Sequence, residues 1–148
     1  MVALLAADLV DELAERVSPR ILEAPERTDA VRRQLDEYFE GDRRSFDVPI
    51  DWSLVRGFAG NVLRATARVP FGSVSSYRDI ATAAGSPNAY RAAGNALGSN
   101  PIPIVVPCHR VLHSGGGLGG YTGGLERKRH LLHLEGVLDA TDPATGDA

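Results

Sequence analysis

The sequence predicts an α+β fold in which two short, closely joined helices follow a mainly helical N-terminal segment. Three observations carry this prediction. Apolar residues recur at helical spacing in several stretches of the chain. Two short helices, each with its own capping signal, meet at a turn that contains a glycine. A short apolar run and a glycine-rich segment then precede a last helix rich in leucine.

The first 51 residues predict two amphipathic helices. Residues 4–17 have apolar side chains at helical spacing, namely Leu5, Leu9, Leu13 and Val17. Residues 29–41 predict a second helix, which Thr28 can cap and Gly41 can end. The apolar face of this second helix consists of Val31, Leu35, Tyr38 and Phe39. The composition changes near residues 51–53, which we take as a domain boundary.

Three helices are predicted to follow this boundary. The first covers residues 53–69, with inward side chains that include Phe58, Val62, Ala65 and Val69. The second covers residues 77–85, where Ser76 and Asp79 form a capped start and Gly85 marks the end. The third covers residues 87–99, with Ser86 as its cap and Pro87 at its first position. The second and third together form a helix-turn-helix candidate, although many helical hairpins bind no ligand.

The apolar run 102–106 predicts a buried strand that leads to Cys108. The glycine-rich segment has seven glycines in residues 115–124. It lacks the strand, GxxxxGK and helix order of a phosphate-binding loop, so nucleotide binding is rejected and a flexible hairpin loop is the simplest interpretation. Residues 125–136 predict the last helix, with its leucines mostly inward, and residues 137–148 predict an acidic flexible tail.

Composition limits the kind of protein. With 43% hydrophobic residues in 148, the chain can bury a core. Cys108 is the only cysteine, which excludes an internal disulfide and a multi-cysteine zinc site and favours a reducing, cytoplasmic location. The N-terminus lacks the basic start of a signal peptide, and no stretch approaches the roughly 18 apolar residues of a membrane span. We therefore expect no membrane partner.

The net charge of −3 conceals an uneven distribution. Residues 1–52 have 13 acidic and 7 basic side chains, residues 53–136 have 3 acidic and 9 basic, and residues 137–148 have 3 acidic. A basic segment between acidic ends is typical of a protein that binds a polyanion. The alternative interpretation is an arginine-rich surface that only contacts solvent.

The chemistry centres on Cys108 and His109. A free thiol has a pKa near ~8.5, so a nucleophilic cysteine needs a base or a positive field beside it. Adjacent side chains on a strand point to opposite faces, so a bridging water is the natural link between thiol and imidazole. Glu135 is one of three acids in the basic segment and is the best candidate to orient the imidazole. The alternative is a buried thiol with a structural role only.

Residues 72–136 resemble the O6-alkylguanine-DNA alkyltransferases, also called methylated-DNA–protein-cysteine methyltransferases. The resemblance rests on motifs that occur in the family's order and spacing: the SY helix start, the NP-P turn, the PCHRV box, GGLGGYTGG and the closing LEG. Residues 18–71 match more loosely. The resemblance implies DNA repair in which the alkyl group of O6-alkylguanine, and also of O4-alkylthymine, passes irreversibly to the protein's own cysteine. It implies one turnover per molecule, no cofactor and a monomer.

The resemblance also implies roles for single residues. Cys108 becomes the alkyl acceptor, His109 the water-linked base, Glu135 its orienter and Asn100 the residue that holds the turn before the active-site segment. The positions that match DNA-contacting residues are Tyr77, Arg78, Ser86, Arg91 and Ser114. The positions that match pocket walls are Pro103, Val111, Tyr121 and Thr122.

In the family, the helix-turn-helix enters the minor groove of double-stranded DNA. Tyr77 would then lie against the flipped nucleotide, and Arg91 would fill the gap left in the base stack. A base inside a duplex must leave the stack before a thiolate can reach it, which costs a few kcal/mol. Small residues of the recognition helix allow close approach, namely Ala92, Ala93, Gly94 and Ala96.

The resemblance refines the fold to a C-terminal winged-helix-like helix-turn-helix domain preceded by a truncated, mainly helical remnant of a small α/β domain. Residues 1–51 form the remnant, residues 52–136 the DNA-binding and alkyl-acceptor domain, and residues 137–148 the tail. Full-length relatives begin with several strands, which this sequence does not predict. No metal site is expected, because His130 and His133 have i,i+3 spacing but no third ligand.

Two other functions compete with this prediction. A non-enzymatic sensor of alkylated DNA would bind the same lesions, but such alkyltransferase-like proteins lack the cysteine that is present here. A cysteine hydrolase with a histidine and a carboxylate would turn over a small substrate, and it would leave the helix-turn-helix and Arg91 without a role.

Overall fold

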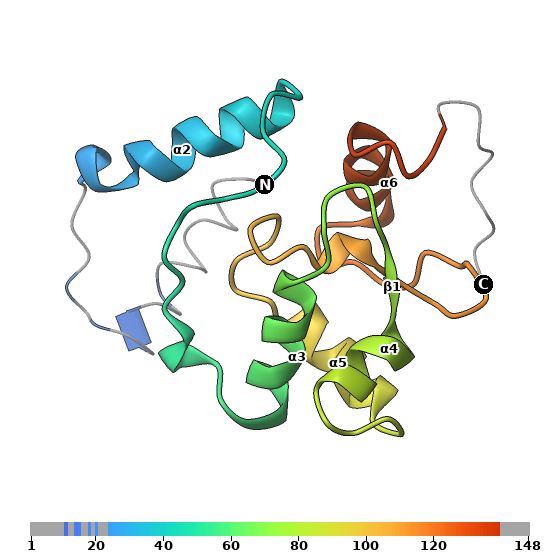
Figure 1. Ribbon diagram of the computed structural model, residues 1–148. Coiled ribbons are helices and arrows are strands. Elements are labelled where there is room, and N and C mark those ends of the chain that lie inside the picture. The colour runs from blue at the N-terminus through green and yellow to red at the C-terminus, as the bar shows by residue number, and fades with distance from the viewer. Residues whose placement is uncertain (1–10, 12–13, 16–17, 19, 21–23, 140–148) are drawn as a thin grey trace.

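The computed structural model describes residues 11, 14–15, 18, 20 and 24–139, and it shows a helix-rich chain with one small sheet (Figure 1). The elements in order are α2 (Pro25–Phe39), the 3-10 helix η1 (Trp52–Leu54), α3 (Gly57–Ala67), β1 (Ser75–Ser76), α4 (Tyr77–Ala83), α5 (Tyr90–Gly98), the 3-10 helix η2 (Cys108–Arg110), β2 (Val111–Leu112) and α6 (Leu125–Leu134). Most of the helix predicted over residues 4–17 falls outside the described residues; within it only Asp11, Ala14 and Glu15 are described, and they are helical. None of the described helices is long and apolar enough to cross a membrane.

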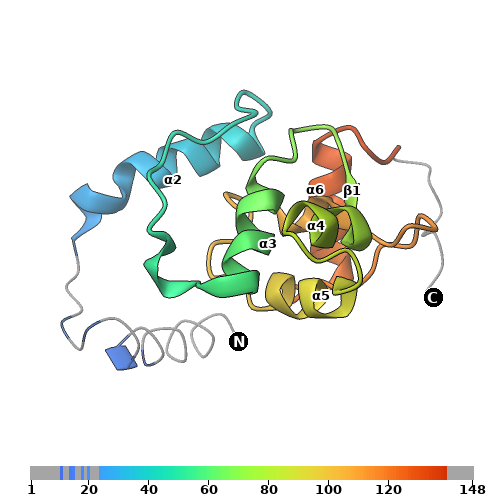
Figure 2. The ribbon, with the colours of Figure 1, turned by 60° about the horizontal axis from the view of Figure 1, so that its bottom comes forward.

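Helices α3, α4 and α5 pack against one another and contain most of the core (Figure 2). On α3 the predicted inward residues Val62 and Ala65 are buried and Phe58 is only half-buried; Val69, which lies beyond the end of the helix, is half-buried as well. Thr66 is buried as well. Its hydroxyl donates a hydrogen bond to the Val62 carbonyl at 2.8 Å, so its burial leaves no unpaired polar group in the core.

The sheet consists of two short parallel strands. Ser75 of β1 pairs with Val111 of β2, and Ser76 pairs with Leu112. Because β1 runs directly into α4 and β2 directly follows η2, this pair fixes the start of α4 relative to Cys108.

The strand predicted over residues 102–106 is wrong. This segment has only an isolated bridge between Pro103 and Val106, and Ile104 has a φ of +74°. Proline has no backbone N–H for a sheet ladder. The Asn100 side chain supplies the hydrogen bonds instead, donating to the Val106 carbonyl at 2.8 Å and accepting from the Ile102 N–H at 3.0 Å.

Of the three capping residues predicted in the described part of the chain, one is confirmed and two are wrong. The Ser76 hydroxyl oxygen caps α4 by accepting from the Asp79 N–H at 3.0 Å. Helix α5 begins at Tyr90 rather than Pro87, because the chain after Ser86 first makes a turn. Helix α2 begins at Pro25, so Thr28 lies inside the helix and does not cap it.

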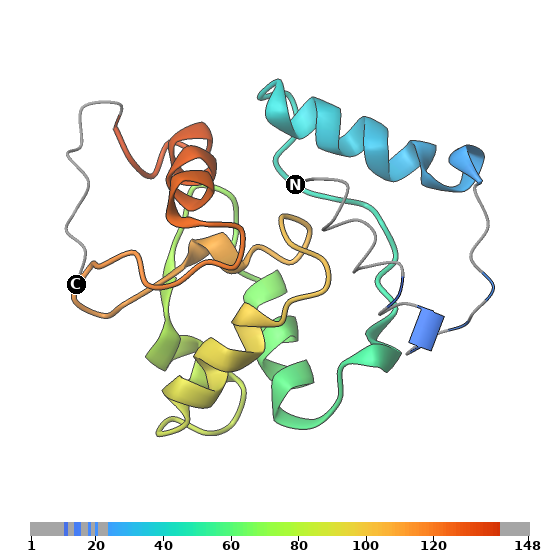
Figure 3. The ribbon, with the colours of Figure 1, turned by 180° about the vertical axis from the view of Figure 1, so that it is seen from behind.

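In Figure 3, helix α2 (blue) and helix α6 (red) both lie in the upper part of the view, and α4 and α5 lie in the lower part. Its end carries the fully buried Tyr38, whose ring packs near Phe46 and Phe71. Phe39 was predicted on the apolar face but is 46% exposed.

The glycine-rich segment is held in place by Lys128 of α6. The ammonium group of Lys128 is fully buried and donates to the carbonyl of Val111 at 2.7 Å, to that of Leu118, and to that of Gly120 at 3.3 Å. Gly119 adopts a φ of +69°, and a Cβ there would lie 2.5 Å from the Tyr77 hydroxyl. The simple interpretation as a flexible loop therefore does not describe this segment.

Replacing Gly119 by alanine is expected to lower the free energy of unfolding by about 2 kcal/mol, because the side chain meets Tyr77 and the backbone conformation disfavours a Cβ. Gly120→Ala is the matched control, since no atom lies within 4 Å of a Cβ at that position. Chemical denaturation of both variants measures the difference. Equal stability of the two variants would contradict this account.

Candidate active site around Cys108

Cys108 begins the 3-10 helix η2 and faces a cavity. Pro107 precedes it, and the Cys108 N–H donates to the Val106 carbonyl at 2.8 Å, so the backbone turns sharply at this point. The residue is 8% exposed and lines a cavity of about 540 Å³. The thiol is thus buried but accessible from one side.

Four other residues predicted from the sequence line the same cavity, namely Tyr77, Arg91, Tyr121 and Thr122. Tyr90, Leu97 and His113 also line the cavity, although no site role was predicted for them, and so does Gly94, which was predicted only as a small residue of the recognition helix. Pro103 and Val111 do not. Val111 is fully buried in β2, paired with Ser75 of β1, and Pro103 is exposed in the irregular turn.

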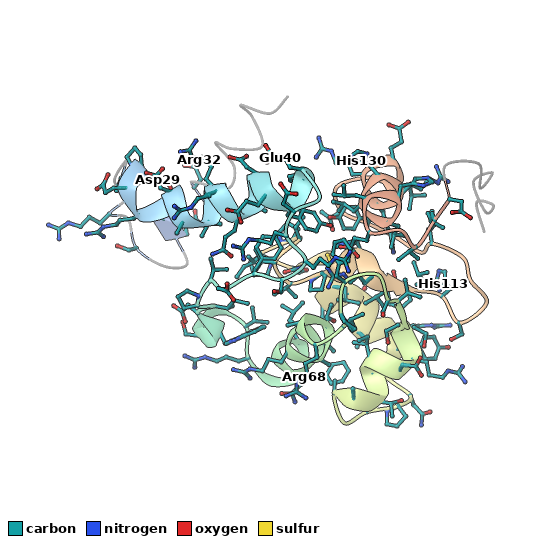
Figure 4. All side chains as sticks on the ribbon, turned by 45° about the horizontal axis from the view of Figure 1, so that its top comes forward. Asp29, Arg32, Glu40, Arg68, His113 and His130 are labelled. Atoms are coloured by element: carbon teal, nitrogen blue, oxygen red, sulfur yellow. The ribbon has the colours of Figure 1, made fainter. Side chains whose placement is uncertain are left out.

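The remaining predicted residues lie near the cavity or at the surface. Arg78 is exposed on α4, with its guanidinium 5.7 Å from the centre of the Tyr90 ring. Ser86 is half-buried in the turn between α4 and α5, and Ser114 is exposed just beyond β2. His113 packs its ring at 5.2 Å from that of Tyr77, and Figure 4 shows it at the edge of the molecule away from α2.

Two opposing influences act on the thiol. Burial raises the pKa of Cys108, while a hydrogen bond from Asn100 and the positive charge of Lys128 lower it. Burial in turn lowers the pKa of Lys128 to about 8, although a charged Cys108 thiolate would raise it. Lys128 was missed in the sequence. The available signal was its position three and four residues before Leu131 and Leu132, on the buried face of α6.

His109 is fully buried, and its Nε2 lies 2.7 Å from Oε1 of Glu135. Because Glu135 also accepts from Arg110, it is ionised, and a carboxylate can only accept. Nε2 must therefore carry the hydrogen in this pair. The other ring nitrogen, Nδ1, is buried and has no hydrogen-bond partner among the described residues, so it is the atom that can accept a proton.

Glu135 directly follows the last residue of α6, and its carboxylate accepts hydrogen bonds from more side chains than the sequence predicted. Arg110 donates from Nε to Oε2 and from Nη2 to Oε1, both at 2.8 Å, and Tyr38 donates to Oε1 at 2.7 Å. Burial alone would raise the pKa of Glu135, but the hydrogen bonds from His109, Arg110 and Tyr38 outweigh it and lower the pKa to about 2. Arg110 is itself anchored by a 2.6 Å hydrogen bond from Nη1 to the Val69 carbonyl.

A buried cysteine that faces a cavity, followed directly in the chain by a buried histidine whose Nδ1 has no partner among the described residues, fits a protein that uses cysteine as a nucleophile. Residues 57–137 match the family model for the DNA-binding domain of 6-O-methylguanine DNA methyltransferase, which is more than half of the chain. The chain belongs to this methyltransferase family.

Curated relatives agree with the family model. The methylated-DNA–protein-cysteine methyltransferase of Mycolicibacterium paratuberculosis is 44% identical over 129 residues, which cover 86% of this chain and 76% of the relative. The protein of the same name from Mycobacterium bovis is 49% identical over 104 residues, covering 69% of this chain and 61% of the relative.

Solved structures agree as well. The Mycobacterium tuberculosis OGT in complex with DNA has a TM-score of 0.68 and 47% identity, with 72% of this chain and 66% of that chain covered. The O6-methylguanine-DNA methyltransferase of the archaeon Pyrococcus kodakaraensis has a TM-score of 0.64 and 32% identity, covering 89% of this chain and 77% of that chain.

The low pKa of Glu135 predicts how stability depends on pH. The folded pKa of about 2 lies below the ordinary value of 4.5. The stability that Glu135 supplies is therefore present above about pH 4.5 and is lost as the pH falls toward about 2. Glu135→Gln should lower the melting temperature at neutral pH and should flatten its fall on acidification.

Thermal unfolding between about pH 7 and about pH 3 measures this effect. Glu126→Gln is the control, because Glu126 is exposed in the first turn of the same helix. The account is wrong if the Glu135→Gln curve stays parallel to that of the unmodified chain.

Proposed function

We propose that this chain repairs DNA by transferring the alkyl group of O6-alkylguanine, and of O4-alkylthymine, irreversibly to Cys108. The observation that carries the proposal is the nearly buried Cys108 at a cavity of about 540 Å³, next to the buried His109–Glu135 pair. Family membership supports the same chemistry. The product would be a thioether on Cys108, and a thiol does not cleave a thioether bond, so the acceptor would not be regenerated.

The proposed step is a displacement at the alkyl carbon. His109 Nδ1 accepts the thiol proton, through a water where the direct geometry is poor, and the imidazolium is stabilised by Glu135. The Cys108 sulfur forms a bond to the alkyl carbon while the bond from that carbon to O6 breaks. Its electron pair stays on the guanine, which then takes up a proton. The thioether product keeps the alkyl group, so each molecule acts once.

The proposed DNA-binding element is a winged-helix-like helix-turn-helix formed by α4 and α5. It belongs to residues 52–136, which we propose as the DNA-binding and alkyl-acceptor domain, after the N-terminal domain 1–51 and before the acidic tail 137–148. Supporting this, the segment 53–136 carries the excess of basic residues, and Arg91 is exposed at the rim of the cavity in the first turn of α5.

Tyr77 and Arg91 then have complementary roles. The extruded nucleotide enters the cavity against the Tyr77 ring, and Arg91 occupies the gap in the base stack. Arg78, Ser86 and Ser114 contact phosphates, which binds duplex without reading its sequence. We further propose that the chain acts as a monomer in the cytoplasm, where a thiol that must remain reduced is protected.

Intact-mass analysis tests the central proposal. After incubation with duplex containing O6-methylguanine, the protein should gain the mass of one CH2 group, confined to Cys108, and release one guanine-containing repaired duplex per molecule. Cys108→Ser should gain nothing. Binding without a mass change would favour a damage sensor, and repeated turnover would favour a hydrolase; either result would refute the proposal.

Arg91→Ala should slow repair of methylated duplex at least ~10-fold, because stacking and charge lost from the gap are worth about 1–3 kcal/mol. It should change the reaction with the free base O6-benzylguanine far less, because the free base needs no extrusion. Single-turnover rates with both substrates measure this. Arg68→Ala is the charge-matched control, since Arg68 is exposed at the end of α3 and does not line the cavity (Figure 4). Equal slowing of both substrates by Arg91→Ala would exclude the proposed role.

A further inference from the structure

Among the contacts described, Tyr38 is the one residue of the N-terminal segment, residues 1–51, that touches the His109–Glu135 pair. It lies 97 positions from Glu135 in the sequence, and its hydroxyl donates to Oε1 at 2.7 Å. The residue is fully buried, and Figure 4 shows why the contact is possible: Glu40, just after α2, lies toward α6, whereas Asp29 and Arg32 lie at the far end. The sequence analysis assigned Tyr38 only to an apolar helix face.

The hydrogen bonds of Glu135 are divided unequally between its two oxygens. Oε1 accepts from Tyr38, from His109 Nε2 and from Arg110 Nη2, at 2.7, 2.7 and 2.8 Å. Among the described residues, Oε2 accepts only from Arg110 Nε, at 2.8 Å. The negative charge on Oε1 is therefore shared among three donors, and His109 receives only part of it.

Tyr38 donates under all ordinary conditions. Burial and the adjacent Glu135 carboxylate raise the pKa of Tyr38, so its hydroxyl keeps its proton. The other groups that face Glu135 are His109 and Arg110, both from η2, and the Arg110 guanidinium is held by the Val69 carbonyl as well. Arg110 alone thus fixes the plane of the carboxylate, and the Tyr38 hydroxyl is an additional donor to the oxygen that serves His109.

We propose that Tyr38 is a positioning residue that acts through Glu135 to limit the reactivity of Cys108. By sharing Oε1, it limits how strongly the carboxylate stabilises a protonated His109. The thiol proton can move to His109 only to the extent that the protonated imidazole is stabilised, so Tyr38 keeps Cys108 mainly as a thiol. This inference rests on the proposed function, because restraint of this kind benefits a protein whose single thiol is used once.

The test measures the rate at which iodoacetamide alkylates Cys108 in the full chain at neutral pH. Tyr38→Phe removes only the hydroxyl. It should raise the rate about two- to threefold, because hydrogen bonds to one group strengthen or weaken one another by a modest fraction. Thr66→Val is the matched control: it removes another fully buried hydroxyl, which binds the Val62 carbonyl and not Glu135, and it should leave the rate unchanged.

A loosened fold could also expose the thiol, so the same substitution is repeated in a Glu135→Gln background. Without the carboxylate, Tyr38→Phe should have no effect on labelling, since residues that act as a unit are not additive. A loosened fold would instead accelerate labelling in both backgrounds. An acceleration in both, or an unchanged or slower rate in the Tyr38→Phe single variant, would overturn the proposal.

Labelling by iodoacetamide needs no guanine substrate, so the two proposals fail separately. If methylated duplex does not alkylate Cys108 in the unmodified chain, the proposed function is wrong whatever Tyr38 does. If methylated duplex reacts but Tyr38→Phe does not accelerate labelling, only the role of Tyr38 is wrong.

Discussion

The buried negative charge of Glu135 is the constraint on which the site depends. An ionised carboxylate away from water is costly unless it is paired and hydrogen-bonded, and here four donor atoms from three side chains supply that compensation. Each donor side chain connects Glu135 to a different part of the structure. Arg110 connects the carboxylate to Val69, just after α3, Tyr38 connects it to α2, and His109 connects it to η2, which begins with Cys108. The chemistry and the packing of the N-terminal segment are therefore parts of one network.

Local features of the sequence predicted much of the fold. The start of α4 was predicted correctly from Ser76 and Asp79, because a capping signal acts over three residues and needs no partner elsewhere in the chain. The same reasoning failed at Ser86 and Thr28, where a turn and an upstream proline determined the helix start instead. The apolar run 102–106 resembled a strand by composition, but Pro103 within it and the side chain of Asn100 replaced the ladder with an irregular turn.

The site was predicted in part. The pairing of His109 with Glu135 followed from the scarcity of acids and the family resemblance, and the structure places the two side chains in contact. Arg110 and Tyr38 were missed because their shared partner, Glu135, lies 25 and 97 positions away, where no spacing rule applies. Lys128 was missed as well, although its partners lie 8 to 17 positions away. Lys128 also resembles a surface residue by type, and only its position on the leucine face of α6 indicated burial. The roles assigned to the DNA-contacting residues remain predictions.

The two-residue ladder between β1 and β2 fixes the distance between two parts of the site. It joins the start of α4 to the segment that carries Cys108 without an intervening flexible loop. The position of Tyr77, at the start of α4, relative to Cys108 is thus set by covalent and hydrogen-bonded geometry. Both residues line the same cavity, so this two-residue ladder also sets the width of the cavity between the tyrosine ring and the thiol.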